Sequence, residues 1–368
     1  MNMDGIPSKK IVQMDEKSIK IGWRAPANIA LIKYWGKRAN QLPENGSLSI
    51  TLENSFTTTF LSIRKKEKAD GAIGMKYYFH GALNQKFEKK IDQLISQLQT
   101  EMPFLSDYKL IFHSENNFPH SAGIASSASS MAAMALCLVS MEQIVTKRKL
   151  GKVDFFRRAS TIARLGSGSA SRSLYGGIVT WGAIASMKGS SDEYATPFPL
   201  QELSRLMQAR DIILIVNSKE KQVSSSLGHA MMVAHPYREG RKNQANSNLN
   251  EFIKAISEAN YHLIAKIAEN EALSLHALLM TSASGTILLQ PNTLQIIEEI
   301  KKFRESTGLD LFFTIDAGPN VHLIYYEEQR EMVLQLVKDK LIPYCENGQW
   351  IDDKIGNGPK LLTPEIEL

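Results

Sequence analysis

The sequence predicts an α+β protein built from two domains that meet near residue 205. The chain has 368 residues, which is enough for two domains of ordinary size. Its first half mixes strand-like and helical segments, whereas its second half alternates long helical segments with a few strongly apolar strands. A polar passage that contains proline, MKGSSDEYATPFP, separates the two patterns.

The composition is that of a globular enzyme or binding protein. Hydrophobic residues make up 43% and charged residues 22% of the chain. The net charge of +5 suits anionic small molecules and is too diffuse to indicate nucleic acid. The apolar run 131–139 is less than half of the ~20 residues that span a bilayer, and MNMDGIPSKK lacks the apolar core of a signal peptide. Cys137 and Cys345 match neither a disulfide framework nor a metal pattern. We therefore expect a cytoplasmic protein that binds neither nucleic acid nor membranes.

The first domain is expected to span 18–205, after a polar tail at 1–17. Strand-like segments rich in β-branched and aromatic residues, bounded by turn residues, stand at 18–26, 47–52, 57–63, 76–81 and 109–116. Helical spacing of apolar residues marks 87–99, 128–139 and 153–164. The segment GGIVTWG, at 176–182, is a further predicted strand.

The second domain is expected to span 206–345, before a tail at 346–368. A short helix at 201–209 leads into it. The continuous apolar segment DIILIVN, at 211–217, is typical of a buried strand. The remaining segments are predicted helices near 221–235, 247–279, 292–306 and 328–340, and a strand pair at 311–316 and 321–326.

A serine-rich segment, NFPHSAGIASSASS at 117–130, leads into the helix that starts near residue 128. A helix N-terminus offers unsatisfied N–H groups and the positive end of the macrodipole, which attract anions. Gly123 lets a backbone approach closely, and residues 116–141 contain no carboxylate. Three hydroxyls can cap the helix or donate to phosphate oxygens: Ser126, Ser127 and Ser129. The segment fits a phosphate-binding turn, and it also fits a small-residue helix start needed for tight packing.

A second carboxylate-free span, 155–191, contains RLGSGSASRS. Gly166 and Gly168 give backbone access, and four serines supply donors. The planar guanidinium of Arg172 suits two-point contact with a carboxylate or phosphate. A flexible polar loop is the alternative reading.

Two further segments carry charged groups with two interpretations each. Lys33 and Lys37 flank an aromatic pair, and ammonium groups at this spacing can bind a diphosphate or simply lie exposed on a strand edge. Asp316 ends the strand at 311–316 and enters a Gly-Pro-Asn turn. It is either a cap of that turn or a catalytic carboxylate at a strand end.

Together these segments resemble the GHMP kinase superfamily and, within it, the diphosphomevalonate decarboxylase family. The four motifs APANIALIKYWGK, NNFPHSAGIASSAS, RLGSGSASRSLYGG and FTIDAGPN stand in the expected order between residues 21 and 341. Arg172 stands where GHMP kinases commonly carry an aspartate, and Asp316 where they carry a glycine-rich triplet. The resemblance implies a GHMP kinase-like fold, with a ribosomal-protein-S5-domain-2-like α/β domain followed by a ferredoxin-like α+β domain.

The resemblance also implies ATP-dependent conversion of mevalonate 5-diphosphate to isopentenyl diphosphate, a step of isoprenoid biosynthesis. Asp316 would act on the 3-hydroxyl, Arg172 would grip the carboxylate, and Lys33 would orient Asp316 and keep it ionised. The implied substrate-binding residues are Tyr34, Lys37, Ser167, Gly168, Ser169, Arg172 and Ser225. The implied nucleotide-binding residues are Asn116, Gly123, Ser126, Ser127 and Ser129. ATP and Mg²⁺ are the implied cofactors, without assigned ligands for the ion, and relatives often form homodimers.

Two positions depart from the family pattern. His229 aligns with a methionine of many members, and His120 with a threonine or another small residue. These departures leave the phosphorylation state of the substrate open, since mevalonate or its monophosphate could be preferred. A kinase or decarboxylase of the same superfamily acting on those substrates, and a non-catalytic nucleotide-binding protein, are the alternatives.

Overall fold

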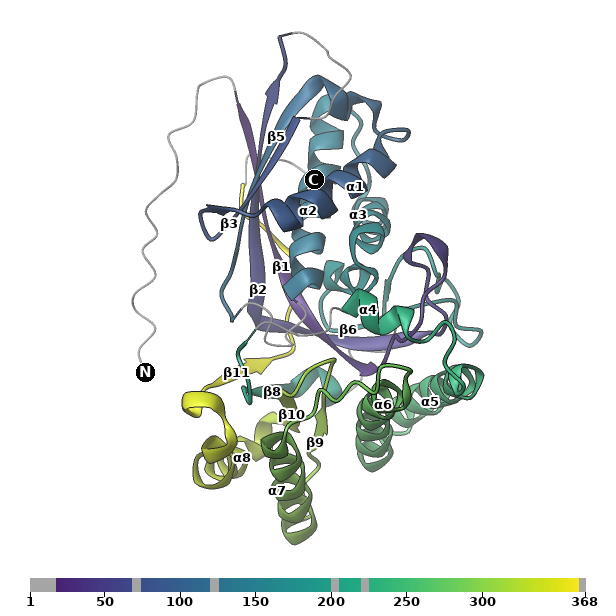
Figure 1. The fold of residues 1–368 in the computed structure, drawn as a ribbon, viewed down its shortest axis with the longest axis vertical. Coiled ribbons are helices and arrows are strands. Elements are labelled where there is room, and N and C mark those ends of the chain that lie inside the picture. The colour runs from purple at the N-terminus through teal and green to yellow at the C-terminus, as the bar shows by residue number, and fades with distance from the viewer. Residues whose placement is uncertain (1–17, 68–73, 120–125, 200–204, 220–224, 364–368) are drawn as a thin grey trace.

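The computed structural model describes residues 18–67, 74–119, 126–199, 205–219 and 225–363 (Figure 1). They form two antiparallel-rich sheets, each with helices packed against it. The predicted two-domain α+β fold is thereby confirmed at the level of fold class.

The first sheet is built around two long strands, β1 (Ile19–Ile32) and β2 (Ser47–Lys65). Its strand order is β12-β1-β2-β5-β3-β4, and β6 pairs with β2 and β7. All pairs are antiparallel except β3 with β5. The other strands are β3 (Gly74–Phe79), β4 (Ala82–Leu83), β5 (Tyr108–Asn116), β6 (Ile178–Trp181), β7 (Thr196–Pro197) and β12 (Lys360–Leu361).

The strand β2 is a single element where two strands were expected. Register shifts against β1 between Pro26 and Asn28, and again between Ala30 and Ile32, bend the pair without ending it. As a result, the beginning of β2 pairs with β6, whereas its later part pairs with β5. The bend carries the last residues of β1 toward the second sheet.

Three helices cover one face of the first sheet: α1 (Gln85–Leu98), α2 (Ser126–Thr146) and α3 (Lys152–Gly166) (Figure 1). The helix α2 lies at the centre and contacts β1, β2 and α3. Among the described residues it is the one helix that is long and apolar enough to cross a bilayer, but 83% of its apolar window is buried inside the protein. It is therefore the core helix of this half of the molecule.

The second sheet has the order β11-β8-β10-β9 and is antiparallel throughout. Its strands are β8 (Ala209–Leu214), β9 (Phe312–Thr314), β10 (Val321–Tyr326) and β11 (Trp350–Lys354). The helices of this half are α4 (Ser225–Ala230), α5 (Arg238–Ser257), α6 (Tyr261–Thr281), α7 (Pro291–Thr307) and α8 (Arg330–Leu336).

The single helix predicted at 247–279 is wrong, because the chain turns between α5 and α6. Ala259 adopts a positive φ of 51°, which ends α5. The side chain of Asn260 then accepts a hydrogen bond from Leu263 N and caps α6. The two helices pack against each other (Figure 1).

The segment predicted as a tail at 346–368 contains two strands. Trp350–Lys354 forms β11 on the edge of the second sheet, and Lys360–Leu361 forms β12 beside Trp23 and Arg24 of β1. The chain thus returns to the first sheet near its C-terminal end. Apolar residues of both sheets also share one core, for example Ile29 and Leu31 of β1 with Ile213 of β8 and Phe252 of α5.

Candidate active site

An ion pair between the two halves of the chain forms the centre of the site. Lys33, directly after β1, donates from Nζ to Asp316 Oδ1 at 2.8 Å and to the carbonyl oxygen of Ala30 at 2.7 Å. The side chain of Lys33 is 1% exposed, whereas that of Asp316 is 27% exposed. The ammonium therefore holds the carboxylate from the protein interior, and the carboxylate faces the accessible side.

Burial and charge act on Lys33 in opposite directions. Burial lowers the pKa of Lys33, while the negative charges of Asp316 and Glu271 raise it. Lys33 is thus a buried cation whose charged form depends on its acidic neighbours.

The turn at Asp316 is formed by the main chain. Gly318 N donates to the carbonyl oxygen of Asp316 at 2.7 Å, and His276 Nε2 lies 3.1 Å from the same oxygen. The main chain of Asp316 forms the turn, and its carboxylate is directed to Lys33.

Arg172 lies in a short 3-10 helix, Gly168–Leu174, that follows α3. It is 3% exposed, and donates from Nε to Asn28 Oδ1 at 3.3 Å and from Nη1 to Ser47 Oγ at 2.6 Å. Burial lowers the pKa of Arg172 to about 10, and the charge of Asp316 opposes that shift. Arg172 therefore stays cationic at neutral pH and lies within electrostatic reach of Asp316.

Asn28 and Ser47 are site residues that the sequence analysis missed. Asn28 Nδ2 donates to Ser173 Oγ at 2.8 Å and to the carbonyl oxygen of Ser169 at 3.2 Å, so it joins β1 to the serine-rich 3-10 helix. The available signal was an amide inside the apolar strand PANIALI. A buried amide in such a strand needs polar partners.

An aromatic wall stands beside this cluster. The ring of Tyr34 lies 4.8 Å from that of Trp181 and 4.3 Å from that of His229. Tyr34 Oη is buried and has no hydrogen-bond partner within the described part of the chain. A Cβ added to Gly168 would lie 2.8 Å from that hydroxyl. Tyr34 and Gly168 thus form a close contact that leaves one polar atom for a ligand.

His229 joins α4 to this wall. Its Nδ1 accepts a hydrogen bond from Gly36 N at 3.0 Å, and its ring lies 4.9 Å from that of Trp35. Burial, together with the charges of Lys37 and Arg172, lowers the pKa of His229 to about 3. The imidazole is therefore neutral at physiological pH.

The other predicted substrate-binding residues lie around the wall. Lys37 donates from Nζ to Gln41 Oε1 at 2.9 Å, and burial lowers its pKa. Ser167 and Ser169 flank Gly168 and are half-buried. Ser225 is the first residue of α4.

The predicted phosphate turn is only partly described. Ser126 and Ser127 open α2 and are half-buried, whereas Gly123 and His120 lie outside the described residues. Asn116, at the end of β5, accepts from Thr57 Oγ1 at 2.7 Å, and its buried Nδ2 has no partner among the residues described here. An open donor there is consistent with a ligand contact.

Ser129 does not lie where the sequence analysis expected it. It is fully buried, and its hydroxyl lies 2.6 Å from Thr57 Oγ1 and 3.3 Å from the carbonyl oxygen of Ser126. Its position on α2 turns it toward β2, so its hydroxyl joins helix to sheet and is not presented to a phosphate.

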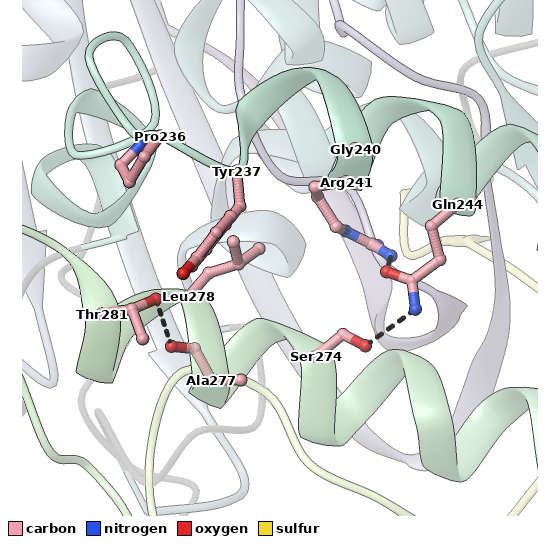
Figure 2. Close-up of a pocket in the computed structure, with 9 residues that line it drawn as sticks. All are labelled: Pro236, Tyr237, Gly240, Arg241, Gln244, Ser274, Ala277, Leu278 and Thr281. Atoms are coloured by element: carbon pink, nitrogen blue, oxygen red, sulfur yellow. Dashed lines mark hydrogen bonds between the residues drawn. The ribbon is translucent and has the colours of Figure 1, made fainter.

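No cluster of three or more His, Cys, Asp or Glu side chains that could hold a metal ion occurs in the described ranges. A cavity of about 440 Å³ lies between α5 and α6, where Tyr237, Arg241 and Thr281 line it (Figure 2).

Two family models match the chain. The diphosphomevalonate decarboxylase-like N-terminal domain matches residues 25–195, and the mevalonate 5-diphosphate decarboxylase C-terminal domain matches residues 211–361. Among curated relatives, the diphosphomevalonate decarboxylase of Gibberella zeae is 31% identical over 328 residues, which is 86% of this chain and 83% of that protein. The Saccharomyces cerevisiae enzyme is 30% identical and covers 85% of this chain and 79% of its own length.

Solved structures with the same fold cover nearly the whole chain. The mevalonate diphosphate decarboxylase of Staphylococcus aureus has a TM-score of 0.79 and 28% identity, covering 95% of this chain and 99% of that one. A structure on mevalonate diphosphate-mediated ATP binding by the Enterococcus faecalis enzyme has a TM-score of 0.78 and 27% identity, covering 94% and 99%. A complex with MVAPP, AMPPCP and magnesium has a TM-score of 0.78 and 28% identity, with the same coverage.

Proposed function

The chain belongs to the diphosphomevalonate decarboxylase family, and we propose that Asp316, Lys33 and Arg172 carry out the ATP-dependent decarboxylation of that family. The enzyme is a carboxy-lyase of the mevalonate pathway, and its cofactors are ATP and Mg²⁺. It converts mevalonate 5-diphosphate and ATP to isopentenyl diphosphate, ADP, phosphate and carbon dioxide. The observation that supports this assignment best is the Lys33–Asp316 ion pair within electrostatic reach of a buried Arg172.

Asp316 is the group that acts on the 3-hydroxyl. Lys33 holds one carboxylate oxygen, and an opposite charge at hydrogen-bond distance favours the ionised form of Asp316. An ionised carboxylate on the accessible side can orient the hydroxyl and accept its proton as the oxygen attacks the γ-phosphate of ATP. A positioned base of this kind contributes about 100-fold or more to the rate.

Arg172 is the group that holds the substrate carboxylate. Asn28 and Ser47 fix its guanidinium, and burial strengthens its interaction with an anion. In the second step the C3–O bond breaks and the 3-phosphate leaves with its electron pair. The electrons of the C–CO₂ bond then form the new double bond and carbon dioxide departs. Arg172 keeps the carboxyl group aligned with the leaving phosphate. Asp316, ionised again once its proton has passed to solvent at its exposed face, stabilises the positive charge that develops at C3.

The diphosphate and nucleotide are assigned to the two serine-rich regions. The open hydroxyl of Tyr34, the ammonium of Lys37 and the neighbouring segment 167–169 suit the substrate diphosphate. Ser126 and Ser127 at the start of α2, with the open amide of Asn116 and with Gly123, suit the ATP phosphates. Bound Mg²⁺ would neutralise phosphate charge there, held by serine hydroxyls together with phosphate and water oxygens.

Product analysis tests this function. The purified chain is incubated with ATP and magnesium and with mevalonate, its 5-phosphate or its 5-diphosphate in parallel, and ADP, phosphate and carbon dioxide are measured. We expect all three products in equal amounts with the 5-diphosphate. ADP without carbon dioxide would identify a kinase, and nucleotide binding without turnover on any substrate would identify a non-catalytic protein.

A further inference from the structure

A buried ion pair lies directly behind Lys33 and takes no part in the chemistry described above. Arg241 of α5 is 3% exposed and Glu271 of α6 is 0% exposed. Arg241 donates from Nη1 to Glu271 Oε1 at 2.7 Å and from Nη2 to Oε2 at 2.5 Å. Asn248 Nδ2 donates to Glu271 Oε1 at 2.6 Å. The carboxylate is therefore fully engaged and its orientation is fixed.

The helices that carry this pair are themselves held together. Figure 2 shows Arg241 beside Gln244 on α5. Gln244 accepts from Arg241 Nη1 at 3.2 Å and donates to Ser274 Oγ of α6 at 3.1 Å. The pair thus belongs to a polar seam between α5 and α6, and Arg241 also lines the cavity of Figure 2.

The pair binds the main chain of Lys33. Glu271 Oε2 accepts the hydrogen bond of Lys33 N at 2.8 Å. The carbonyl oxygen of Lys33 accepts from Arg241 Nη2 at 3.3 Å and from Asn45 Nδ2 at 3.0 Å. Both backbone polar groups of Lys33 are therefore held by side chains, and two of these side chains come from the helices of the second half.

We propose that Arg241 and Glu271 are positioning residues of the decarboxylation reaction, which hold the backbone of Lys33 so that its ammonium stays against Asp316. The inference rests on the proposed function of Lys33 and Asp316. Neither Arg241 nor Glu271 reaches the side of the site on which the Asp316 carboxylate is exposed, so neither is a catalytic residue.

Charge gives the pair a second effect on the site. Burial lowers the pKa of Lys33, and the charge of Glu271 opposes that shift, after the larger contribution of Asp316. Arg241, Glu271, Lys33 and Asp316 thus alternate in charge from the α5–α6 seam to the site. A pair that only filled space could be replaced by apolar residues, since buried ion pairs rarely stabilise a fold better than apolar packing does.

The substitution Glu271→Gln tests the charge of the pair separately from its hydrogen bond to Lys33 N. Its amide oxygen can still accept from Lys33 N, but the negative charge is lost. We expect kcat to fall by about 10- to 100-fold, while KM for the substrate stays within about threefold, because the change acts on the reacting groups rather than on binding. We also expect the alkaline limb of the kcat profile to move to lower pH, because Lys33 then loses its proton more easily.

A matched control is available on the same helix. Glu269 of α6 is also buried, at 8% exposed, and forms a two-point pair with Arg304, at 2.6 Å and 3.2 Å, without any described contact to Lys33. Glu269→Gln should lower the thermal midpoint as Glu271→Gln does, yet leave the alkaline limb in place. An equal shift of that limb in both variants would overturn the proposal.

A second variant keeps the test decisive if Glu271→Gln does not fold. Arg241→Lys retains the charge pair with Glu271 but removes the planar fork that also reaches the carbonyl oxygen of Lys33. It should lower kcat at least fivefold without moving the alkaline limb, because Glu271 keeps its charge. Folded variants with the kcat and pH profile of the wild type would refute the role of the pair. Absence of carbon dioxide release by the wild type would instead refute the proposed function itself.

Discussion

At the scale of single residues, the site depends on where charge is buried and where it is accessible. Lys33 is almost wholly buried, whereas more than a quarter of the Asp316 side chain remains exposed. The cation is thereby held in one geometry, and the anion keeps a face for the substrate. Arg172 is also a cation held in one geometry, because hydrogen bonds to Asn28 and Ser47 fix its guanidinium.

The role of Asp316 predicts a specific loss. Asp316→Asn keeps the shape of the side chain but cannot accept the proton of the 3-hydroxyl. We expect kcat to fall by at least about 100-fold, with little change in nucleotide affinity, because no phosphate contact is assigned to Asp316. Steady-state kinetics and nucleotide titration measure the two quantities.

The control for that prediction is another half-exposed aspartate. Asp310 bonds to Arg205 at 2.8 Å, outside the site, and Asp310→Asn should leave kcat unchanged. A fall in nucleotide affinity with normal turnover in Asp316→Asn would remove Asp316 from its assigned role.

Single residues also show which parts of the site could be predicted from the sequence. Motifs brought Lys33, Arg172 and Asp316 to attention, and the structure places them in one cluster. Ser129 could not be separated from Ser126 and Ser127 by composition, because only the rotation of α2 decides which hydroxyl faces β2. Glu271 gave no local signal, since its partners Lys33 and Arg241 are distant in sequence.

At the scale of elements, the 3-10 helix Gly168–Leu174 sets the distance between the aromatic wall, formed by Tyr34 and Trp181, and the serines that flank Gly168. It begins directly after α3, with Gly168 as its first residue and Arg172 near its C-terminal end. A Cβ at Gly168 would lie 2.8 Å from Tyr34 Oη and 2.9 Å from Trp181. The glycine is therefore needed for space.

That close contact predicts the effect of a single methyl group. Gly168→Ala should displace Tyr34 or the 3-10 helix, so KM for the diphosphate substrate should rise about tenfold and stability should fall by about 1–3 kcal/mol. Gly151→Ala, at the start of α3, is the control, because a Cβ there meets nothing within 4 Å. Equal KM values for the two variants would show that Gly168 does not shape the substrate site.

Helices were predicted correctly where the apolar periodicity is strong, and elements were missed where the local sequence carries no signal for them. The helices α1, α3 and α7 follow their apolar spacing closely. The break between α5 and α6 depends on a positive φ at Ala259, which has no signature in an alanine. β11 was missed because an edge strand such as WIDDK carries several charges and little apolar alternation.

At the scale of the whole molecule, the two sheets are joined by buried acids as well as by a shared core. Asp353 of β11 is fully buried, and its Oδ1 accepts from Glu53 N at 3.0 Å and from Asn54 N at 2.7 Å, both in β2. It stands opposite Asp211 of β8. Burial raises the pKa of Asp353 to about 6, with a smaller contribution from Asp211.

This raised pKa predicts how stability changes with pH. A carboxyl group whose pKa is higher in the folded state stabilises the fold when protonated, and that contribution is lost as pH rises through the folded-state value of about 6. Asp353→Asn keeps the acceptor Oδ1 and cannot ionise. Its stability relative to the wild type should therefore increase by about 2 kcal/mol between about pH 4.5 and about pH 8.

Urea unfolding at several pH values measures that difference. Asp92→Asn changes an exposed carboxylate of α1 and should give a flat difference over the same range. If Asp353→Asn gave an equally flat difference, Asp353 would have to be ionised throughout the range.

The pairing of β12 with Trp23 and Arg24 has a consequence for biosynthesis. The ribosome must add roughly 160 residues between β7 and β12, which takes about 8–33 s at common elongation rates. During that interval the outer edge of β1 is unpaired at these residues in the nascent chain. Unpaired strand edges invite association with other chains, so slow translation or early termination before residue 360 should favour aggregation and the recruitment of chaperones.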